Sequence, residues 1–196
     1  MRPNGWRRAV FLDRDGTLIE ERNYLSSLEE VRWLPGAVEG LRLLQARGFA
    51  LVVVTNQSGV ARGYFPRRFV EETHRVMDRY LRRRGIEVAG WYFCPHHPEA
   101  GAPPLRRRCR CRKPAPGMVE RAARELGLRL RGSFLVGDSP ADLECGRRSG
   151  LIPLLVRTGH GPSTLARLRE AGRMVVSFPD LLRAARWICR TSVAAP

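Results

Sequence analysis

Short apolar runs alternate along the chain with longer segments in which apolar residues recur every three or four positions. The runs are rich in Val, Leu and Phe and stop abruptly at polar residues, which is typical of strands buried on both faces of a parallel sheet. Helices are expected between them, because the apolar residues of those segments fall on one face. The expected strands cover residues 10–12, 49–54, 90–93, 134–136 and 152–156, with a short edge strand at 175–176.

Proline and glycine mark the ends of two expected helices. One begins after Pro35-Gly36 and ends at Gly48, and the other begins at Pro66 and ends at Gly85. Residues 18–34 show no clear period and are expected to form a loop or small hairpin over the strand ends. Further helices are expected over 118–126, around Asp142, after a capping Ser163, and over 181–188. The alternation predicts an α/β fold with a parallel sheet flanked by helices.

The composition fits one domain. With 196 residues, 43% of them hydrophobic, the chain is long enough for one core and short for two. We expect a single, monomeric domain over 1–196, with a disordered tail at about 190–196. No apolar run approaches the ~20 residues of a membrane helix, and the apolar run after the basic N-terminus is too short for a signal peptide. A cytoplasmic location is therefore expected.

The formal net charge of +16 is compatible with a nucleic-acid-binding protein, because clustered arginines neutralise phosphates. The arginines, however, are spread over the whole chain and are not interleaved with aromatic residues. We attribute most of the charge to replacement of lysine by arginine, with some electrostatic attraction of an anionic substrate. Lys113 is the single lysine, which indicates a position that requires a compact ammonium and does not fit a planar guanidinium.

Two aspartates, Asp13 and Asp15, follow the first expected strand. In open parallel sheets the carboxyl ends of the strands face the ligand-binding crevice. Two carboxylates held close together repel each other, and a hard divalent cation with oxygen ligands relieves the repulsion. The pair predicts a magnesium-assisted reaction; the simpler alternative is an Asp-x-Asp-Gly turn at the end of a strand.

Polar residues also follow the second and fourth expected strands. Residues 55–58, Thr-Asn-Gln-Ser, offer hydroxyls and amides for a phosphoryl oxygen, although Thr55 is also a possible helix cap. Asp138 follows the fourth strand, and Asp142 lies one helical turn later, where it can face the same metal directly or through water. Lys113 precedes a helix whose N-terminus also favours a phosphate.

A second group of candidate metal ligands combines three cysteines with a histidine. Cys94-Pro95-His96 and Cys109-Arg110-Cys111 form two tight pairs joined by a loop rich in Pro, Gly and Arg. Three thiolates and an imidazole are typical of a closed, tetrahedral, structural zinc site, and the adjacent His97 is a rival for the histidine position. The zinc ion is expected to hold the loop 94–111 beside the crevice. Free cysteines and a zinc module that binds nucleic acid are the alternatives.

Four motifs occur in the order that is characteristic of one enzyme superfamily. They are Asp13-x-Asp15-Gly16-Thr17, Val54-Thr55-Asn56-Gln57, Lys113-Pro114 and residues 136–142, Val-Gly-Asp-Ser-Pro-Ala-Asp. Over residues 7–157 the chain resembles the haloacid-dehalogenase superfamily of phosphotransferases. Within it, the chain is most similar to the heptose-bisphosphate phosphatases, with the histidinol-phosphate phosphatases as near relatives. The resemblance implies a Rossmann-like sheet, and it assigns the histidine ligand of zinc to His96. No large cap domain is expected, because the loop after Asp15 and the segment after the second strand are both short.

The resemblance also implies roles for individual residues. Asp13 is expected to attack phosphorus and form an aspartyl-phosphate, while Asp15 protonates the leaving alcohol and then deprotonates water. Thr55 and Lys113 are expected to bind the phosphoryl group during catalysis. Mg²⁺ is expected to be bound by Asp13, the backbone carbonyl of Asp15, Asp138 and Asp142. Zn²⁺ is expected to be bound by Cys94, His96, Cys109 and Cys111. The substrate is expected to contact Tyr24, Asn56, Gln57, Ser58, Arg112 and Lys113.

Local sequence favours a heptose bisphosphate over histidinol phosphate. Residues 52–63 and the sequence Cys-Pro-His-His-Pro at 94–98 resemble the heptose enzymes more than the histidinol-phosphate phosphatases. Arg112 suits a second phosphate on the substrate. The resemblance thus implies removal of the 7-phosphate from D-glycero-D-manno-heptose 1,7-bisphosphate. Ser139 departs from relatives that carry Lys there, which is expected to loosen the preference for one anomer. The remaining histidines, His74, His97 and His160, are expected on solvated surfaces. Cys145 and Cys189 are expected in the interior.

Overall fold

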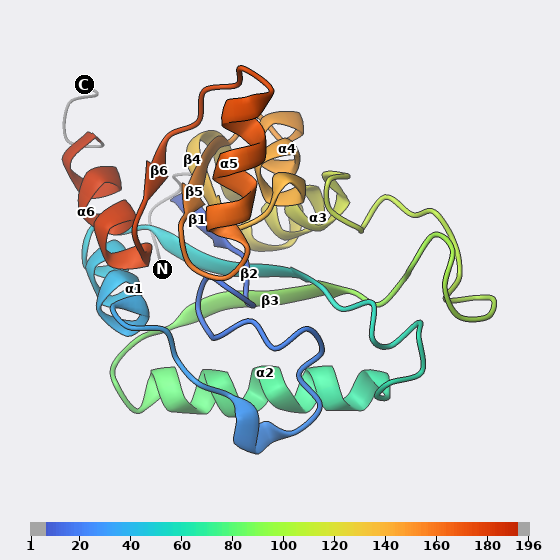
Figure 1. Ribbon diagram of the computed structural model, residues 1–196. Helices are drawn as coiled ribbons and strands as arrows, with labels where there is room; N and C mark the ends of the chain where they lie inside the picture. Colours follow the sequence, from blue (N-terminus) through green and yellow to red (C-terminus); the bar gives the residue numbers. More distant parts are fainter. Residues whose placement is uncertain (1–6, 192–196) are drawn as a thin grey trace.

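Six strands lie at the centre of residues 7–191, the part of the chain that the computed structural model describes (Figure 1). They are β1 (Arg7–Leu12), β2 (Ala50–Asn56), β3 (Val88–Cys94), β4 (Leu128–Gly137), β5 (Ile152–Val156) and β6 (Ser177–Phe178). The strands form one sheet with the order β3-β2-β1-β4-β5-β6, and all neighbouring pairs are parallel. The predicted α/β class and parallel sheet are confirmed.

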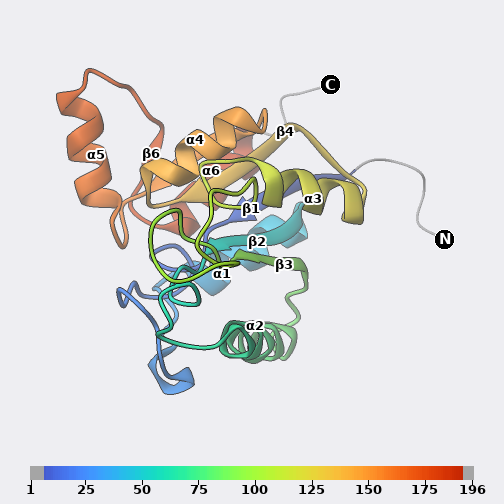
Figure 2. The ribbon, with the colours of Figure 1, turned by 90° about the vertical axis from the view of Figure 1, so that its right-hand side faces the viewer.

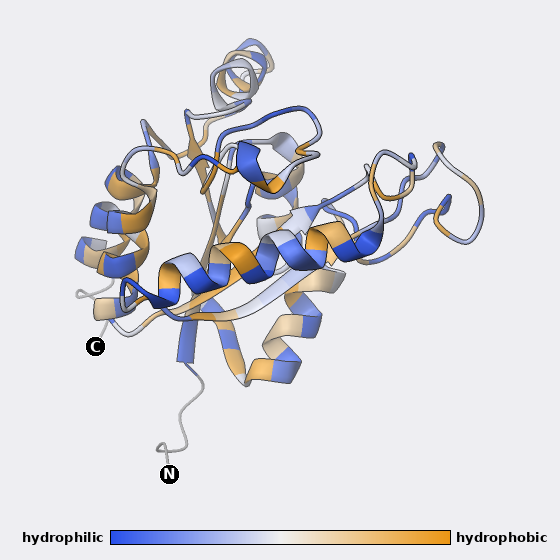
Figure 3. Cartoon of the chain, turned by 90° about the horizontal axis from the view of Figure 1, so that it is seen from below, coloured by the Kyte–Doolittle hydropathy of each residue, from blue (hydrophilic) through white to orange (hydrophobic). Residues whose placement is uncertain are grey.

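Helices connect the strands and cover both faces of the sheet. In the described residues they are the 3₁₀-helix η1 (Leu28–Glu30) and the α-helices α1 (Ala37–Ala46), α2 (Arg67–Arg82), α3 (Gly117–Leu126), α4 (Pro140–Arg148), α5 (Gly161–Glu170) and α6 (Leu181–Thr191). Figure 2 shows α3 and α4 on one side of the sheet and α1 and α2 on the other. Polar and apolar bands alternate along α2 in Figure 3, as expected for a helix with one face on the sheet.

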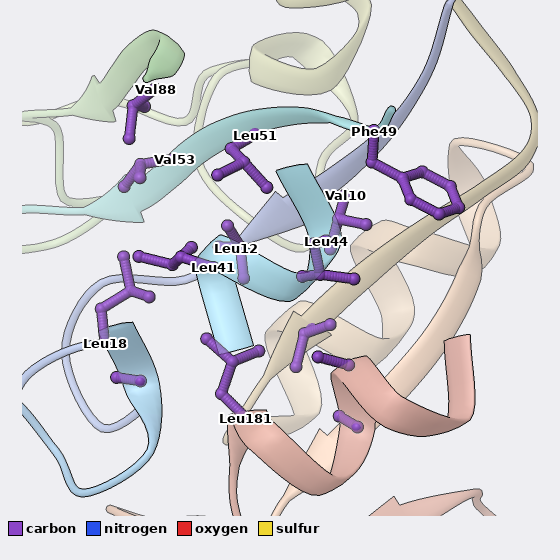
Figure 4. Close-up of a cluster of buried hydrophobic side chains, with 14 of the residues drawn as sticks. Val10, Leu12, Leu18, Leu41, Leu44, Phe49, Leu51, Val53, Val88 and Leu181 are labelled. Carbon is purple, nitrogen blue, oxygen red and sulfur yellow. The ribbon is translucent and has the colours of Figure 1, made fainter. Parts of the chain in front are cut away.

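The apolar run of β1 is explained by burial on both faces. Val10 and Leu12 belong to one cluster of buried side chains and Phe11 to another, on the opposite side of the sheet. Figure 4 shows the first cluster, in which Leu41 and Leu44 of α1 approach β1. Full burial of such a side chain contributes roughly 1.5–3 kcal/mol, so no position of β1 in the interior favours a polar residue.

Two predictions at the C-terminal edge of the sheet are wrong. The edge strand β6 begins at Ser177, directly after the predicted pair 175–176, and Val176 is exposed. The helix α5 begins at Gly161 with His160 as its N-cap, so Ser163 is not the cap but donates its hydroxyl to the His160 carbonyl. The first error arises because β6 has only two residues, and the second because a serine in the first turn of a helix can bond the backbone without being its N-cap.

The fourth strand is longer than predicted. β4 begins at Leu128, whereas the sequence indicated only 134–136. Its pairing with β1 changes register between Arg8 and Val10, and Gly132 has a left-handed φ of 75°. This irregularity breaks the apolar pattern of the first half of the strand, which explains why the pattern did not reveal it.

His74 lies in the interior, and its predicted place on a solvated surface is wrong. It is on the sheet-facing side of α2 with 5% of its surface exposed, and its ring lies 5.0 Å from that of Trp91. At the other end of the chain, α6 includes Arg190 and Thr191, and the rest of the predicted tail lies outside the described residues. None of the helices in residues 7–191 has the length and apolar character needed to span a membrane.

Candidate active site

Three predicted acids meet at the carboxyl ends of β1 and β4. These strands are neighbours in the sheet, so Asp13, directly after β1, comes close to Asp138, directly after β4. Asp142, in the first turn of α4, approaches from the same side. Carboxylate oxygens of the three residues all lie within 4.8 Å of one another, and each residue is less than 9% exposed.

Lys113 reaches into this acidic group from the loop before α3. Its Nζ lies 2.7 Å from Oδ1 of Asp13 and 2.6 Å from Oδ1 of Asp142, and it donates a 2.8 Å hydrogen bond to the Val54 carbonyl. Burial alone would lower the pKa of Lys113, but the two carboxylates outweigh it and raise the pKa. The buried amine is therefore held as a cation beside Asp13.

The donor set fits a hard divalent cation. Burial, and to a smaller extent the neighbouring carboxylates, raises the pKa of Asp13 well above its usual value and that of Asp138 to about 6, so their negative charge is unfavourable where it is buried. Three carboxylates and one ammonium leave an excess of negative charge on oxygen atoms, as Mg²⁺ sites require. Gly16 allows the close approach of the first motif: a Cβ there would lie 2.1 Å from Oδ2 of Asp138.

Asp142 has a structural role in addition to its place in the acidic group. Its Oδ2 accepts hydrogen bonds from the Ser139 backbone N–H at 3.1 Å and the Ser139 hydroxyl at 2.5 Å. Ser139 is the N-cap of α4, so the two residues form a reciprocal capping box. Asp142 thus has two roles: Oδ1 pairs with the Lys113 ammonium and orients it, and Oδ2 takes part in capping α4.

Asp15 is not part of this acidic group, and three side chains hold its carboxylate. Arg14 donates from Nε and Nη2 at 3.0–3.2 Å, Gln57 donates from Nε2 at 2.8 Å, and the Thr55 hydroxyl lies at 3.4 Å. Thr55 is therefore part of the site, not a helix cap, since the next helix begins only at Arg67. These contacts fix the orientation of the Asp15 carboxyl group.

The predicted zinc ligands form a second cluster. One ligand atom each from Cys94, His96, Cys109 and Cys111 lies within 4.8 Å of the others, and Nδ1 of His96 is 3.2 Å from Sγ of Cys111. The hydrogen bond between the Sγ atoms of Cys111 and Cys94, 3.3 Å apart, is the main cause that lowers the pKa of Cys111 to about 5, so a thiolate is accessible for a metal. His97 is outside the cluster; its Nδ1 accepts from backbone N–H groups of its own loop. Three thiols and one imidazole in this arrangement fit tetrahedral Zn²⁺.

Comparison with known proteins agrees with this geometry. A family model described as HAD-hydrolase-like matches residues 110–182. A D-glycero-beta-D-manno-heptose-1,7-bisphosphate 7-phosphatase of Photorhabdus laumondii is 39% identical over 181 residues, which cover 92% of this chain and 96% of that protein. The alpha-anomer 7-phosphatase of the same organism is 36% identical over 158 residues, 80% of this chain and 86% of that protein.

The chain belongs to the heptose-1,7-bisphosphate 7-phosphatase family of the haloacid-dehalogenase superfamily. A solved relative agrees in structure as well. The crystal structure of the D,D-heptose 1,7-bisphosphate phosphatase from B. bronchiseptica, complexed with magnesium and phosphate, has a TM-score of 0.82 and 34% identity, and the match covers 94% of this chain and 99% of that one. Membership in this family of phosphomonoester hydrolases confirms the superfamily predicted from the four motifs.

Most of the substrate contacts predicted for this phosphatase surround one small cavity. The cavity has a volume of about 280 Å³ and is lined by Asp15 together with four predicted residues, Tyr24, Asn56, Gln57 and Ser58. The ring of Tyr24 packs edge-on against Tyr64, with 4.7 Å between the centroids. Arg112 and Lys113 do not line this cavity: Nη1 of Arg112 donates to the His96 carbonyl at 3.2 Å, and the Lys113 ammonium lies in the acidic group. The structure thus gathers the residues of the crevice and leaves Arg112 on the zinc loop.

Three residues of the phosphatase site were not predicted. Arg14, 2% exposed, makes the forked contact with Asp15 described above, and its only sequence signal is a basic residue between two acids. Glu21 and His160 line the same small cavity, with 3.9 Å between the Glu21 carboxylate and the His160 ring. Burial, and next the charge of Asp15, raises the pKa of Glu21. The backbone N–H of His160 also donates to Asp138 at 2.7 Å.

Proposed function

We propose that this protein removes the 7-phosphate of D-glycero-D-manno-heptose 1,7-bisphosphate through an aspartyl-phosphate on Asp13. One observation carries the proposal: the buried Lys113 ammonium lies between Asp13 and Asp142, next to Asp138, at the carboxyl ends of adjacent strands. A carboxylate can attack a phosphate only where the negative charge of the phosphate is compensated, and this arrangement supplies a fixed cation beside the attacking group.

The proposed reaction has two steps. An Asp13 oxygen attacks phosphorus, the bond from phosphorus to the sugar oxygen breaks, and Asp15 gives its proton to the leaving alkoxide. Water then attacks the aspartyl-phosphate and passes a proton to Asp15, which restores the Asp13 carboxylate and releases inorganic phosphate. Oδ1 of Asp13 is engaged by Lys113, so Oδ2 is the oxygen that attacks. Thr55 and Gln57 hold Asp15 for both proton transfers.

Two metals are part of the proposal. Asp13, Asp138 and the backbone carbonyl of Asp15 would hold Mg²⁺, with Asp142 acting through water, because both of its oxygens already have partners. Bound magnesium would offset charge on the phosphoryl oxygens. Zinc at Cys94, His96, Cys109 and Cys111 would be structural, since four protein ligands leave no open position. The cysteines of residues 7–191 form no disulfide, which fits our inference of a location in the reducing cytoplasm; we also infer that the protein is a monomer.

The choice between anomers depends on the region around Ser139. Relatives with either anomer in their names have similar identity to this chain, 39% and 36%, so similarity alone does not decide. The Ser139 hydroxyl is directed to Asp142 within the capping box and is too short to reach a distant phosphate. We therefore infer that this protein discriminates weakly between the 1α- and 1β-phosphates.

The proposal is tested by phosphate release in the presence of Mg²⁺. Specificity constants are measured side by side for the α- and β-heptose bisphosphates and for histidinol phosphate. We expect both heptose bisphosphates to exceed histidinol phosphate, because a second anionic group suits an arginine-rich surface and the cationic ammonium of histidinol does not. A preference for histidinol phosphate would contradict the substrate assignment. Binding of single-stranded nucleic acid without any phosphate release would favour the nucleic-acid-binding module instead.

A further inference from the structure

The side chain of Asn56 makes two hydrogen bonds to the backbone of one residue. Its Nδ2 donates to the Lys113 carbonyl at 3.0 Å, and its Oδ1 accepts from the Lys113 backbone N–H at 3.0 Å. Asn56 is the last residue of β2, and Lys113 lies 57 positions later. The amide therefore holds Lys113 on both sides of its Cα, much as a neighbouring strand would.

The same strand also holds the other end of the lysine. The Val54 carbonyl accepts a hydrogen bond from the Lys113 ammonium at 2.8 Å, and Val54 stands two positions before Asn56. Backbone and ammonium of Lys113 are thus both attached to β2, a central strand whose residues 50–55 are buried. A displacement of the Lys113 backbone relative to β2 would move the ammonium away from Asp13, so the position of the cation depends on Asn56.

Lys113 is also close to the zinc cluster in the chain. Cys111 precedes it by two positions, and the intervening Arg112 donates to the His96 carbonyl at 3.2 Å. The segment that follows the zinc loop therefore meets the end of β2 at Lys113 through the Asn56 amide, in addition to the backbone contact in which the Gln57 N–H donates to the Cys94 carbonyl at 2.8 Å.

We propose that Asn56 is a positioning residue: it fixes Lys113 against β2 and couples the zinc loop to the phosphate-binding cation. The inference rests on the proposed function for its kinetic consequence. It gives Asn56 a role different from the substrate contact expected from the sequence, because Oδ1 and Nδ2 are both committed to Lys113. The neighbouring Gln57 and Thr55 are directed to Asp15 instead, as alternation of side chains along an extended segment requires.

The kinetic test replaces Asn56 by Ala. If Asn56 positions Lys113, kcat should fall about 10- to 100-fold, since a small misplacement of a catalytic group has effects of this size, while KM stays within about twofold. If Asn56 binds the substrate, KM should rise and kcat should be retained, which would overturn the inference. Asn56→Asp keeps the shape and the acceptor but loses the donor, so it provides a second, nearly isosteric variant should the alanine variant not fold.

A matched control is available in Gln45. Its amide also binds backbone at two points far from the crevice, donating to the Gly85 carbonyl at 2.7 Å and accepting from the Glu87 N–H at 2.6 Å. Gln45→Ala removes the same kind of contact, so it should lower thermal stability comparably and leave kcat unchanged. An equal loss of kcat in the Asn56 and Gln45 variants would mean a general structural effect and would overturn the positioning role.

The single lysine permits a readout that does not depend on turnover. Lys113 is 4% exposed, so acetic anhydride should modify it slowly relative to the α-amino group of the same chain, as measured by mass spectrometry. In Asn56→Ala the rate should rise at least about tenfold, because the residue is released from β2. An unchanged labelling rate in the variant would refute the inference, whatever the natural substrate. If the parent protein showed no turnover but Lys113 were labelled faster in the variant, only the proposed function would be refuted.

Coupling to the zinc loop is tested with a double variant. Cys111→Ser and Asn56→Ala should each speed the labelling of Lys113. Because both are proposed to act through the same backbone segment, the double variant should label no more than about twice as fast as the faster single variant. Multiplicative rates would show that the two act independently and would overturn the coupling.

Discussion

The ammonium of Lys113 lies 2.7 Å from Oδ1 of Asp13, although 100 positions separate the two residues in the chain. The site around it is small and anionic: two carboxylates and one backbone carbonyl contact the same nitrogen, and the residue is 4% exposed. A guanidinium at this position would need more room and would direct its donors in a plane. This geometry accounts for the one lysine in a chain whose other basic residues are arginine.

Replacement of Lys113 should therefore be costly even when charge is kept. We expect Lys113→Arg to lower kcat at least about 100-fold, because a misplaced cation no longer compensates the phosphate beside Asp13. Lys113→Met should also destabilise the metal-free protein by about 3–5 kcal/mol, since it leaves buried carboxylates without their partner. Steady-state kinetics and thermal unfolding measure the two effects. Arg173→Lys, at an exposed arginine, is the control and should change neither.

The two aspartates of the first motif should differ in what they contribute. Asp13→Asn retains the shape but not the nucleophilic charge, so turnover should fall to background while the melting temperature stays close to that of the parent. Asp15→Asn should bind substrate normally and lose about 10²–10⁴-fold in kcat on a sugar phosphate, with a smaller loss in the first step on an aryl phosphate whose leaving group needs no proton. Phosphate release measures both. Substantial activity of the Asp13 variant would exclude the aspartyl-phosphate.

Positions at strand ends could be predicted from the sequence, whereas side-chain directions could not. Asp13 and Asp138 each follow an apolar run, and parallel strands deliver such residues to one edge of the sheet. The contacts of Arg14 and Asn56 depend on the direction in which each side chain leaves the backbone, which the motif does not specify. For Asn56 the alternation along β2 held a usable signal: Thr55 and Gln57 share one side and Asn56 takes the other.

Parts of the fold were hidden from the sequence for similar reasons. β6 has two residues, too few for a period, and its location depends on pairing with β5. His74 is polar by type, yet α2 turns it toward Trp91 and Phe93 of β3. A histidine on an amphipathic helix fits either face when only its residue type is known, and packing against aromatic rings decides which face it takes.

The zinc site should be required for stability. Cys109→Ser and Cys111→Ser should each lose the metal, lower the melting temperature by several degrees and reduce activity, because the loop that carries Lys113 loosens. Elemental analysis of protein purified without chelators should find one zinc per chain in the parent. Cys189→Ser is the matched control, since this buried cysteine lies in α6, outside the cluster, and its variant should keep the metal. A parent protein without zinc would contradict the assignment.

The buried His74 should make stability fall as the pH is lowered. Burial, and to a smaller extent the charge of Arg14, lowers the pKa of His74 from 6.5 to about 3. In the unfolded chain the imidazole takes up a proton below about pH 6.5, whereas in the folded protein it stays neutral down to about pH 3. The contribution of the neutral His74 imidazole to the free energy of unfolding is therefore fully present above pH 6.5. It is lost progressively between pH 6.5 and pH 3, at about 1.4 kcal/mol per pH unit.

Replacement of His74 by Leu, which has a similar volume and does not titrate, isolates this contribution. Between pH 7.5 and pH 5 the free energy of unfolding of the parent should fall by about 2 kcal/mol more than that of His74→Leu, as measured by urea denaturation at both pH values. The raised pKa values of Asp13 and Asp138 make the free energy of unfolding rise as the pH is lowered, which is opposite to the effect of His74. Because both proteins contain these aspartates, the difference between the two proteins cancels their titration. Parallel losses in parent and variant would mean that His74 becomes protonated in the folded state, and thus that its ring is accessible to water in solution.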